Sequence, residues 1–451
     1  MLLGKARLVD PLLKAVKGSP ADQTLLAVQR EGRTTLRFAN GRIHQNLHEE
    51  EITVWVKVAH GGRAGVATTS SLKQSSLDKA IEAAMAIARL TAKATVPAFS
   101  AAPPEQPTPR LTTHFPATVD QPLTEIVHFL HSLSSRSQKA GLELAGSFVQ
   151  GESELAVVGS QGLTQYQPFS IGGLRLVATQ GKSSGFAAQA FRDINTLETE
   201  ALLDRAWDFC RRNKDSKPLR LGKYDVLLEP EAVAELAEWL GFIGFGAKQV
   251  QERTSFMTGR MGDRIMGKAI SIYDDGSDPR GLAVPFDLEG IPKQRVDLIV
   301  EGKAEGIVYD SQYGKIYHHP STGHALPYDE FEGPLASNLF VRGGQTPRGE
   351  MLKQMGNGLW ITRFHYVSGL LKTQEALMTG LTRDGTFLVE KGKVAGAVKN
   401  LRFTQSVLEA FSNVLAVSRE QHLIGDPAQG FSSVVTPALL IKNFTFTGQT
   451  K

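Results

Sequence analysis

Closely spaced histidines are the first candidates for chemistry, because imidazole is a common metal ligand. A catalytic zinc site usually needs two histidines one helical turn apart, a glutamate that activates water, and a third ligand. The sequence contains neither His-Glu-x-x-His nor His-Glu-x-x-x-His. His44 and His48 fall on an expected hairpin strand, where their spacing separates them by about 13 Å. His128 and His131 share a helix face without an acidic third ligand, so we expect surface or half-buried histidines.

A third histidine group, His318, His319 and His324, flanks a Pro-Ser-Thr-Gly turn that can fold His324 back toward the first two. We interpret the segment mainly as a turn and keep the cluster as the leading metal candidate of the chain. The acidic run at residues 272–281 lacks the spacing and the closing glutamate of a calcium loop. We therefore expect a polar hairpin turn there.

Residues 181–185 read Gly-Lys-Ser-Ser-Gly and satisfy the Gly-x-Ser-x-Gly pattern of a nucleophile elbow, with Ser183 at the centre. That elbow requires a helix after the serine, whereas a strand-like run follows here, so we predict a hairpin turn. Gly241, Gly244 and Gly246 have no preceding strand and turn for a dinucleotide. We predict that they are points of close packing on a buried helix.

The elements that must position these residues fall into three parts, and a proline-rich stretch separates the first part from the second. Residues 1–97 hold two hairpin patterns, one of them turning at Asn40-Gly41, followed by an amphipathic helix after Ser76. Residues 98–121 form a linker, and residues 122–218 form a second unit of helix, strands and helix. Residues 219–451 alternate short strands with glycines and contain a buried helix at 231–250. We predict an α+β protein with two small α+β N-terminal domains and a mainly antiparallel β C-terminal domain.

Composition narrows the class of protein. The chain has 451 residues and a formal net charge of +4, with no dense basic patch, so on charge alone we do not expect direct nucleic acid binding. No apolar run is long enough to span a membrane, and the first residues do not form a secretion signal. Cys210 is the single cysteine, which leaves no intramolecular disulfide and fits a reducing compartment. We expect a cytoplasmic protein.

Eight sequence blocks in order resemble one known family, and they extend from about residue 20 to the C-terminus. The blocks are TTLRFANGRIHQ, the Glu-Pro of VLLEPEAVAEL, TSFMTGRMGDRI, YDDG, VPFDLEGIP, STGHA, GNGLWITRF and TPALLIKNFTFTG. Together they resemble the TldD/PmbA proteins, also called modulators of DNA gyrase. The resemblance implies a zinc metalloprotease system in which two paralogous subunits enclose a substrate chamber.

In that family the TldD-type subunit carries His-Glu-x-x-x-His on a helix of the third domain and a cysteine ligand near the C-terminus. The PmbA-type subunit, also called TldE, carries neither. The corresponding positions here are Leu240, Gly241 and Phe245, and the C-terminal slot at residues 425–430 reads GDPAQG without a cysteine. The resemblance therefore places this chain on the PmbA/TldE branch, with no zinc or catalytic residue of its own and with zinc expected in a TldD-type partner.

The leading hypothesis is a non-catalytic subunit that forms the chamber and binds unfolded peptide for a zinc-bearing TldD-like paralogue. The alternatives are a stand-alone homodimeric peptide-binding protein without protease activity, and an enzyme that uses Ser183 or the third histidine group. Some loops of the matching blocks are candidates for the substrate or partner surface, although turn and packing roles suit them equally. These candidates are Arg37, Asn40, Arg42, Asp287, Glu289, Ser321, Thr322, Gly323 and His324.

Overall fold

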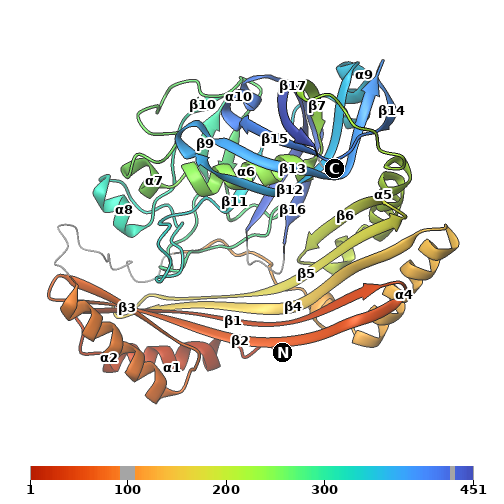
Figure 1. The fold of residues 1–451 in the computed structure, drawn as a ribbon. Coiled ribbons are helices and arrows are strands. Elements are labelled where there is room, and N and C mark those ends of the chain that lie inside the picture. The colour runs from red at the N-terminus through yellow and green to blue at the C-terminus, as the bar shows by residue number, and fades with distance from the viewer. Residues whose placement is uncertain (1, 92–106, 427–431, 450–451) are drawn as a thin grey trace.

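A computed structural model describes residues 2–91, 107–426 and 432–449 of the chain. It contains two sheets that face each other, a six-stranded sheet from the N-terminal half and an eleven-stranded sheet from the C-terminal half (Figure 1). The fold is α+β, as predicted. The first sheet forms a long curved platform beneath the C-terminal unit.

The six-stranded sheet is antiparallel throughout and has the order β3-β2-β1-β4-β5-β6. Its strands are β1 (Gln23–Ala39), β2 (Arg42–His60), β3 (Arg63–Thr69), β4 (Glu143–Gly159), β5 (Thr164–Gln180) and β6 (Ser183–Phe191). The β1–β2 connection is the predicted tight turn, in which Asn40 and Gly41 both have positive φ values, 50° and 73°. The predicted turn at residues 181–182 joins β5 to β6.

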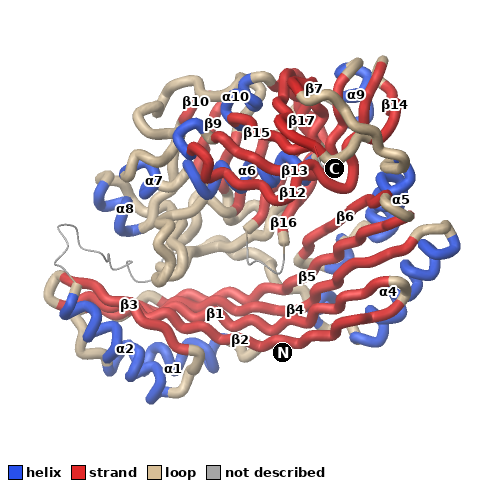
Figure 2. The backbone as a smooth tube through the Cα atoms, in the orientation of Figure 1, coloured by secondary structure: helices blue, strands red, loops and turns tan. Residues whose placement is uncertain are grey.

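Helices cover the outer face of this sheet in two groups (Figure 2). Near one end lie α1 (Lys5–Gly18) and α2 (Gln74–Leu90), and near the other end lie α4 (Leu123–Lys139) and α5 (Thr199–Arg212), with the short α3 (Pro116–Val119) between. Alternate side chains of a strand point to opposite faces. Leu26 and Val28 of β1 therefore pack against α1 and α2, while Leu25 and Ala27 pack toward the C-terminal unit.

The eleven-stranded sheet is mainly antiparallel, with parallel pairings between β7 and β12 and between β11 and β17. Strands β7, β12, β13, β15 and β17 close a ring, because β17 also pairs with β7. The strands are β7 (Gly222–Leu228), β8 (Ile272–Asp274), β9 (Val296–Val300), β10 (Lys303–Ala304), β11 (Asn338–Val341), β12 (Gly358–Lys372), β13 (Leu377–Glu390), β14 (Lys393–Ala397), β15 (Leu401–Ser406), β16 (Val414–Gly425) and β17 (Ser433–Gln449).

The central helix of this unit is α6 (Pro230–Gly244), which packs on β12 and β17 in the largest hydrophobic cluster. Shorter helices complete the unit, namely α7 (Ala247–Gln251), α8 (Ser311–Ile316), α9 (Met351–Met355) and α10 (Val407–Ser412). The predicted helix at 231–250 is thus interrupted, because Gly246 adopts an extended conformation between α6 and α7. Within the described residues no helix is long and apolar enough to cross a membrane.

The two N-terminal segments share one sheet, which the sequence did not indicate. β1 pairs with β4 from Leu25↔Gly159 to Ala39↔Ala145, so the sheet has no break between them. β1 is also continuous through Glu31 and Gly32, although a glycine after a charged residue is a common place for a strand to end. The division at residues 97, 121 and 218 stays a prediction.

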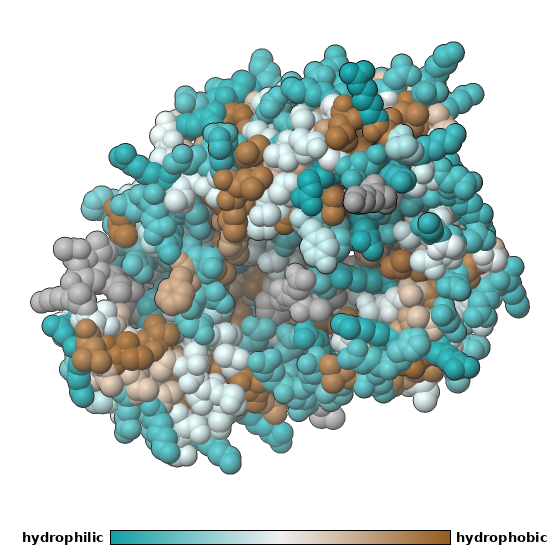
Figure 3. Space-filling view, viewed as in Figure 1, coloured by the Kyte–Doolittle hydropathy of each residue, from teal (hydrophilic) through white to brown (hydrophobic). Residues whose placement is uncertain are grey.

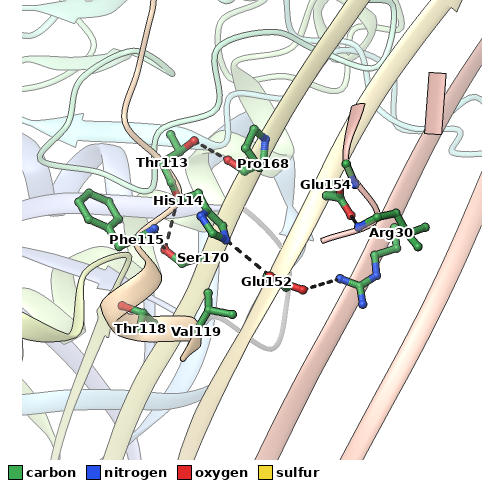
Figure 4. A network of polar contacts seen from close by, with 12 residues as sticks. Arg30, Thr113, His114, Phe115, Thr118, Val119, Glu152, Glu154, Pro168 and Ser170 are labelled. Atoms are coloured by element: carbon green, nitrogen blue, oxygen red, sulfur yellow. Dashed lines mark hydrogen bonds and ion pairs between the residues drawn. The ribbon is translucent and has the colours of Figure 1, made fainter. Parts of the chain in front are cut away.

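Part of the expected linker, residues 98–106, lies outside the described residues, and the part that follows is packed against the sheet (Figure 4). The Thr113 hydroxyl donates to the Pro168 carbonyl (2.7 Å), and the Thr113 carbonyl accepts from the Ser170 amide (2.9 Å). Pro168 and Ser170 belong to the part of β5 that extends past the end of β6. The residue after Thr113, His114, lies 3.5 Å from the buried Glu152 carboxylate, which also pairs with Arg30 at 3.0 Å. This segment is therefore a fixed wall beside β6.

Candidate functional site

A groove runs between the inner face of the six-stranded sheet and the C-terminal unit (Figure 3). It consists of three adjoining pockets of about 510, 120 and 330 Å³, and Ala188 of β6 lines all three. The largest pocket is walled by residues 111–115, by β6, by the loop at 279–283 and by the end of β16. Concave sites of this size are the usual places for ligands.

The floor of the groove is a row of side chains that crosses four strands. Arg37 of β1 lies opposite Ser147 of β4, Ser147 lies opposite Arg175 of β5, and Arg175 lies opposite Ala188 of β6. The adjacent row is uncharged and consists of Thr35, Val149, Gly173 and Ala190. The small residues of both rows leave space above the sheet, and the two arginines lie on either side of Ser147 in the first row.

Two strand edges border the groove. β6 pairs with β5 along one edge, and β16 pairs with β17 along one edge, in the part of the chain that the structure describes. The remaining edges of residues 188–191 and 421–424 both line the largest pocket. An edge with free backbone groups can accept an extended peptide as an added strand.

Carboxylates of α6 form the roof. Glu231 pairs with Arg205 of α5 at 2.7 Å and lines the two pockets nearest to it. Glu235 lies one turn further along α6, beside Arg363. Burial, reinforced by the charge of Glu238, raises the pKa of Glu235 to about 7. The roof therefore changes its charge near neutral pH.

Leu240, Gly241 and Phe245, the positions where the resemblance places the zinc motif of TldD-type subunits, are part of the hydrophobic core. Leu240 and Phe245 are fully buried, and the Phe245 ring packs edge to face on Phe256 with centroids 5.4 Å apart. A Cβ atom at Gly241 would lie 2.8 Å from the Ala336 carbonyl oxygen. The three positions offer no ligating side chain and no space, so they do not fit a zinc ion. Across the described residues, no three His, Cys, Asp or Glu side chains form a group that could hold a metal.

The close packing predicted for Gly241, Gly244 and Gly246 is confirmed, although Gly246 lies between α6 and α7 and not on a helix. A Cβ atom at Gly244 would lie 2.0 Å from the Phe256 ring, and one at Gly246 would lie 2.2 Å from Gln249. Of the C-terminal slot, Gly425 lines both the 120 Å³ and the 330 Å³ pockets, and Asp426 lines the 330 Å³ pocket. Residues 427–430 lie outside the described part.

The first three surface candidates separate in the structure. Arg37 lines the 330 Å³ pocket, Asn40 forms the β1–β2 turn, and Arg42 is exposed at the start of β2.

Asp287 and Glu289 lie in buried loops of the C-terminal unit that face β2. Asp287 accepts hydrogen bonds from the amides of Glu289, Ile291 and Ala325, each at 2.9 Å. Burial and the nearby Glu289 charge raise the pKa of Asp287. Glu289 pairs with Lys57 of β2 at 3.0 Å, which ties the C-terminal unit to the platform.

The segment from Ser321 to His324 is also internal. The Ser321 and Thr322 hydroxyls donate to the Tyr309 carbonyl, and Gly323 has a φ of 75° and sits against Pro292. His324 hydrogen-bonds to Asp274 at 2.8 Å, with both side chains fully buried. Burial lowers the pKa of His324 although the Asp274 charge opposes this. These residues hold loops together at a distance from the groove lining.

The other chemical candidates have local partners. Ser183 donates to the Cys210 carbonyl inside the β6–α5 contact, so its hydroxyl is not presented to a substrate. His319 stacks on Tyr309 with centroids 4.5 Å apart, whereas His324 turns inward to Asp274. The Pro-Ser-Thr-Gly turn therefore does not assemble the third histidine group into a metal site.

The sequence comparisons identify the family. The pattern described as PmbA/TldA metallopeptidase C-terminal domain matches residues 221–448, and the pattern for domain 1 matches residues 26–88. The chain belongs to the PmbA/TldD family. Metalloprotease PmbA of Escherichia coli O157:H7 is 23% identical over 468 aligned residues, which cover 98% of this chain and 95% of that protein.

Two further PmbA/TldD proteins show how far the similarity extends. The Metalloprotease TldD homolog of Haemophilus influenzae is 24% identical over 208 residues, which is 44% of this chain and 42% of that relative, so the chain spans less than half of its length. The crystal structure of TldE from Thermococcus kodakarensis superposes with a TM-score of 0.86 and 20% identity, and the match covers 97% of this chain and 100% of that one. The TldE likeness confirms the fold.

Several groove residues were not predicted, notably Arg175, Ala188 and Glu235. The turns at 40–41 and 181–182 fix the register inside two hairpins, but the pairing of β1 with β4 brings Arg37 and Arg175 into one row. That pairing joins segments distant in sequence, and no local pattern specifies it.

Proposed function

We propose that this PmbA/TldD-family chain is a PmbA/TldE-type subunit that binds unfolded peptide and serves a zinc-bearing TldD-like paralogue without a catalytic zinc of its own. The observation that carries the proposal is the groove bordered by the β6 and β16 edges. A peptide laid along either edge gains backbone hydrogen bonds regardless of its side chains. The hydrophobic packing at Leu240, Gly241 and Phe245 supports the non-catalytic role.

Binding to the chain alone tests the first half of the proposal. An unstructured fluorescent peptide should bind, and the same peptide with N-methyl groups at alternate backbone positions should bind at least tenfold more weakly, because it cannot form the strand ladder. Ala188→Arg should fill the groove and block binding. His128→Arg puts the same side chain at an exposed site of α4 and should bind like the parent chain.

Mixing the chain with a zinc-bearing TldD-type paralogue tests the second half. A tight one-to-one complex that gains proteolytic activity supports the proposal. A persistent self-dimer that binds peptide but produces no proteolysis favours the stand-alone peptide-binding alternative. A cytoplasmic location and the lack of direct nucleic acid binding remain predictions from composition.

A further inference from the structure

We propose that the pocket beside Arg37 is a carboxylate-binding subsite of the groove, which recognises an acidic side chain or the C-terminal carboxylate of an extended peptide. The inference rests on the proposed peptide-binding function and adds the polarity of the bound peptide. The pocket has a volume of about 330 Å³ and is lined at its floor by β1, β4 and β5. That volume accommodates one side chain or a chain end.

The spacing of the two arginines fits one carboxylate. Neighbouring strands of a sheet are about 4.8 Å apart, so Arg37 on β1 and Arg175 on β5 are separated by roughly 10 Å on the same face. The residue between them is Ser147, whose small side chain leaves room above β4. Each guanidinium can extend over Ser147, where two planar forks can clamp a carboxylate.

The charges of the pocket also favour an anion. Among the described residues that line it, the charged side chains are Arg37, Arg175 and Asp426, an excess of one positive charge. Arg175 is paired with Asp426 at 2.9 Å. Arg37 is exposed in the pocket and makes no ion pair or side-chain hydrogen bond with any described residue. An incoming carboxylate would therefore complete the coordination of Arg37.

The rest of the groove lacks this excess. In the largest pocket three arginines, Arg192, Arg205 and Arg280, are matched by Asp193, Glu198 and Glu231. In the smallest pocket Arg175 is paired with Asp426, and Arg363 is paired with Asp384. An extended peptide along β6 would therefore bind with its acidic end toward Arg37.

Asp426 makes the proposal testable in both directions. It competes with the ligand for Arg175, so Asp426→Asn should release that guanidinium and tighten the binding of acidic peptides. Arg37→Gln and Arg175→Gln should weaken it. If these side chains had only a structural role, removing Asp426 and removing an arginine would not change the affinity for acidic peptides in opposite directions.

The experiment measures fluorescence anisotropy with three versions of one unstructured peptide: one with an internal glutamate and a free C-terminus, one with glutamine in its place, and one with an amidated C-terminus. Loss of affinity with glutamine assigns the subsite to an acidic side chain, and loss with the amide assigns it to the chain end. We expect Arg37→Gln to weaken the preferred peptide about tenfold and the neutral version less than about twofold. Arg7→Gln, at an exposed position of α1 outside the groove, is the matched control.

Three results would overturn the inference. Equal binding of all three peptides to the parent chain would remove the carboxylate subsite and leave the proposed function intact. If Arg37→Gln lowered the affinity for acidic and neutral peptides equally, and its thermal unfolding were unchanged, the carboxylate subsite would also be refuted and the proposed function would remain. No binding of any peptide would remove the proposed function together with this inference.

Discussion

Gly241 lies so close to Ala336 that a Cβ atom at Gly241 would come within 2.8 Å of the Ala336 carbonyl oxygen. We predict that Gly241→Ala lowers the free energy of unfolding by about 1–3 kcal/mol, because the backbone at Ala336 must move. Urea unfolding measures the effect. Gly396→Ala is the matched control, since a Cβ atom there has no neighbour within 4 Å. Equal stability of the two variants would contradict the packing at Gly241.

Rebuilding the family motif should fail for the same reason. The triple variant Leu240→His, Gly241→Glu, Phe245→His puts polar groups into a core that lacks further ligands and supporting hydrogen bonds. We expect a strongly destabilised chain without zinc-dependent peptidase activity, measured on an unstructured peptide with added zinc. Zinc-dependent cleavage by this variant would refute our interpretation of α6.

The zinc content of the parent chain is a separate prediction. We expect far less than one zinc per chain by elemental analysis after purification without a metal-affinity step. Binding near one zinc per chain would contradict the proposed function and return attention to His318, His319 and His324. The variants Ser183→Ala and His324→Ala, tested against any hydrolysis that is detected, would then decide whether these residues have a catalytic role.

The shifted pKa of Glu235 predicts a pH dependence of stability. Between its ordinary value of 4.5 and about 7, the unfolded chain releases this proton while the folded chain keeps it. The free energy of unfolding therefore falls as pH rises through this window, and the penalty is complete above pH 7. Glu235→Gln should remove a destabilisation on the order of 1–3 kcal/mol at pH 8 and almost none at pH 4.

Thermal unfolding of the parent and the Glu235→Gln variant across this pH range measures the difference. Glu125→Gln, at an exposed position of α4, serves as the control and should follow the parent curve at every pH. A Glu235→Gln curve parallel to that of the parent would show that the carboxyl is not shifted.

The pair of Asp274 and His324 should be important for stability. His324→Ala removes one of the two hydrogen-bond partners that the fully buried Asp274 carboxylate has among the described residues, and leaves only the Asn338 amide. We expect a loss of about 3 kcal/mol in the free energy of unfolding, with little effect on peptide binding in the groove. His128→Ala, which changes an exposed histidine, should leave urea unfolding unchanged. Loss of peptide binding in a folded His324→Ala chain would place this pair in the binding site instead.

Local patterns predicted much of the fold. The Asn40-Gly41 turn, the hairpin at 181–182 and the buried faces of α2 and α4 all follow from short-range rules. Residues 404–418 have a helix-like apolar spacing, but the helix α10 stops at Ser412 and the apolar residues after Asn413 enter β16. The helix α1 was not predicted, since Pro11 and scattered charges obscure its apolar face.

The candidate site was harder to predict than the elements. Of the nine surface candidates, Arg37 lines the groove, while Asp287 and His324 are held in buried loops. Residue type alone does not tell a carboxylate that binds a ligand from one that accepts backbone amides. Arg175 and Ala188 enter the site only through strand pairings between distant segments.

The central position of β1 has a consequence for how the chain is made. β1 is paired with β2 on one side and with β4 on the other. During synthesis the first hairpins emerge well before β4 (Glu143–Gly159), so the β1 edge stays open until that strand leaves the ribosome. A truncated product that ends near residue 97 would present a long unpaired strand and would tend to associate with other copies. The first 97 residues of this chain therefore depend on about the next sixty residues for their folding and solubility.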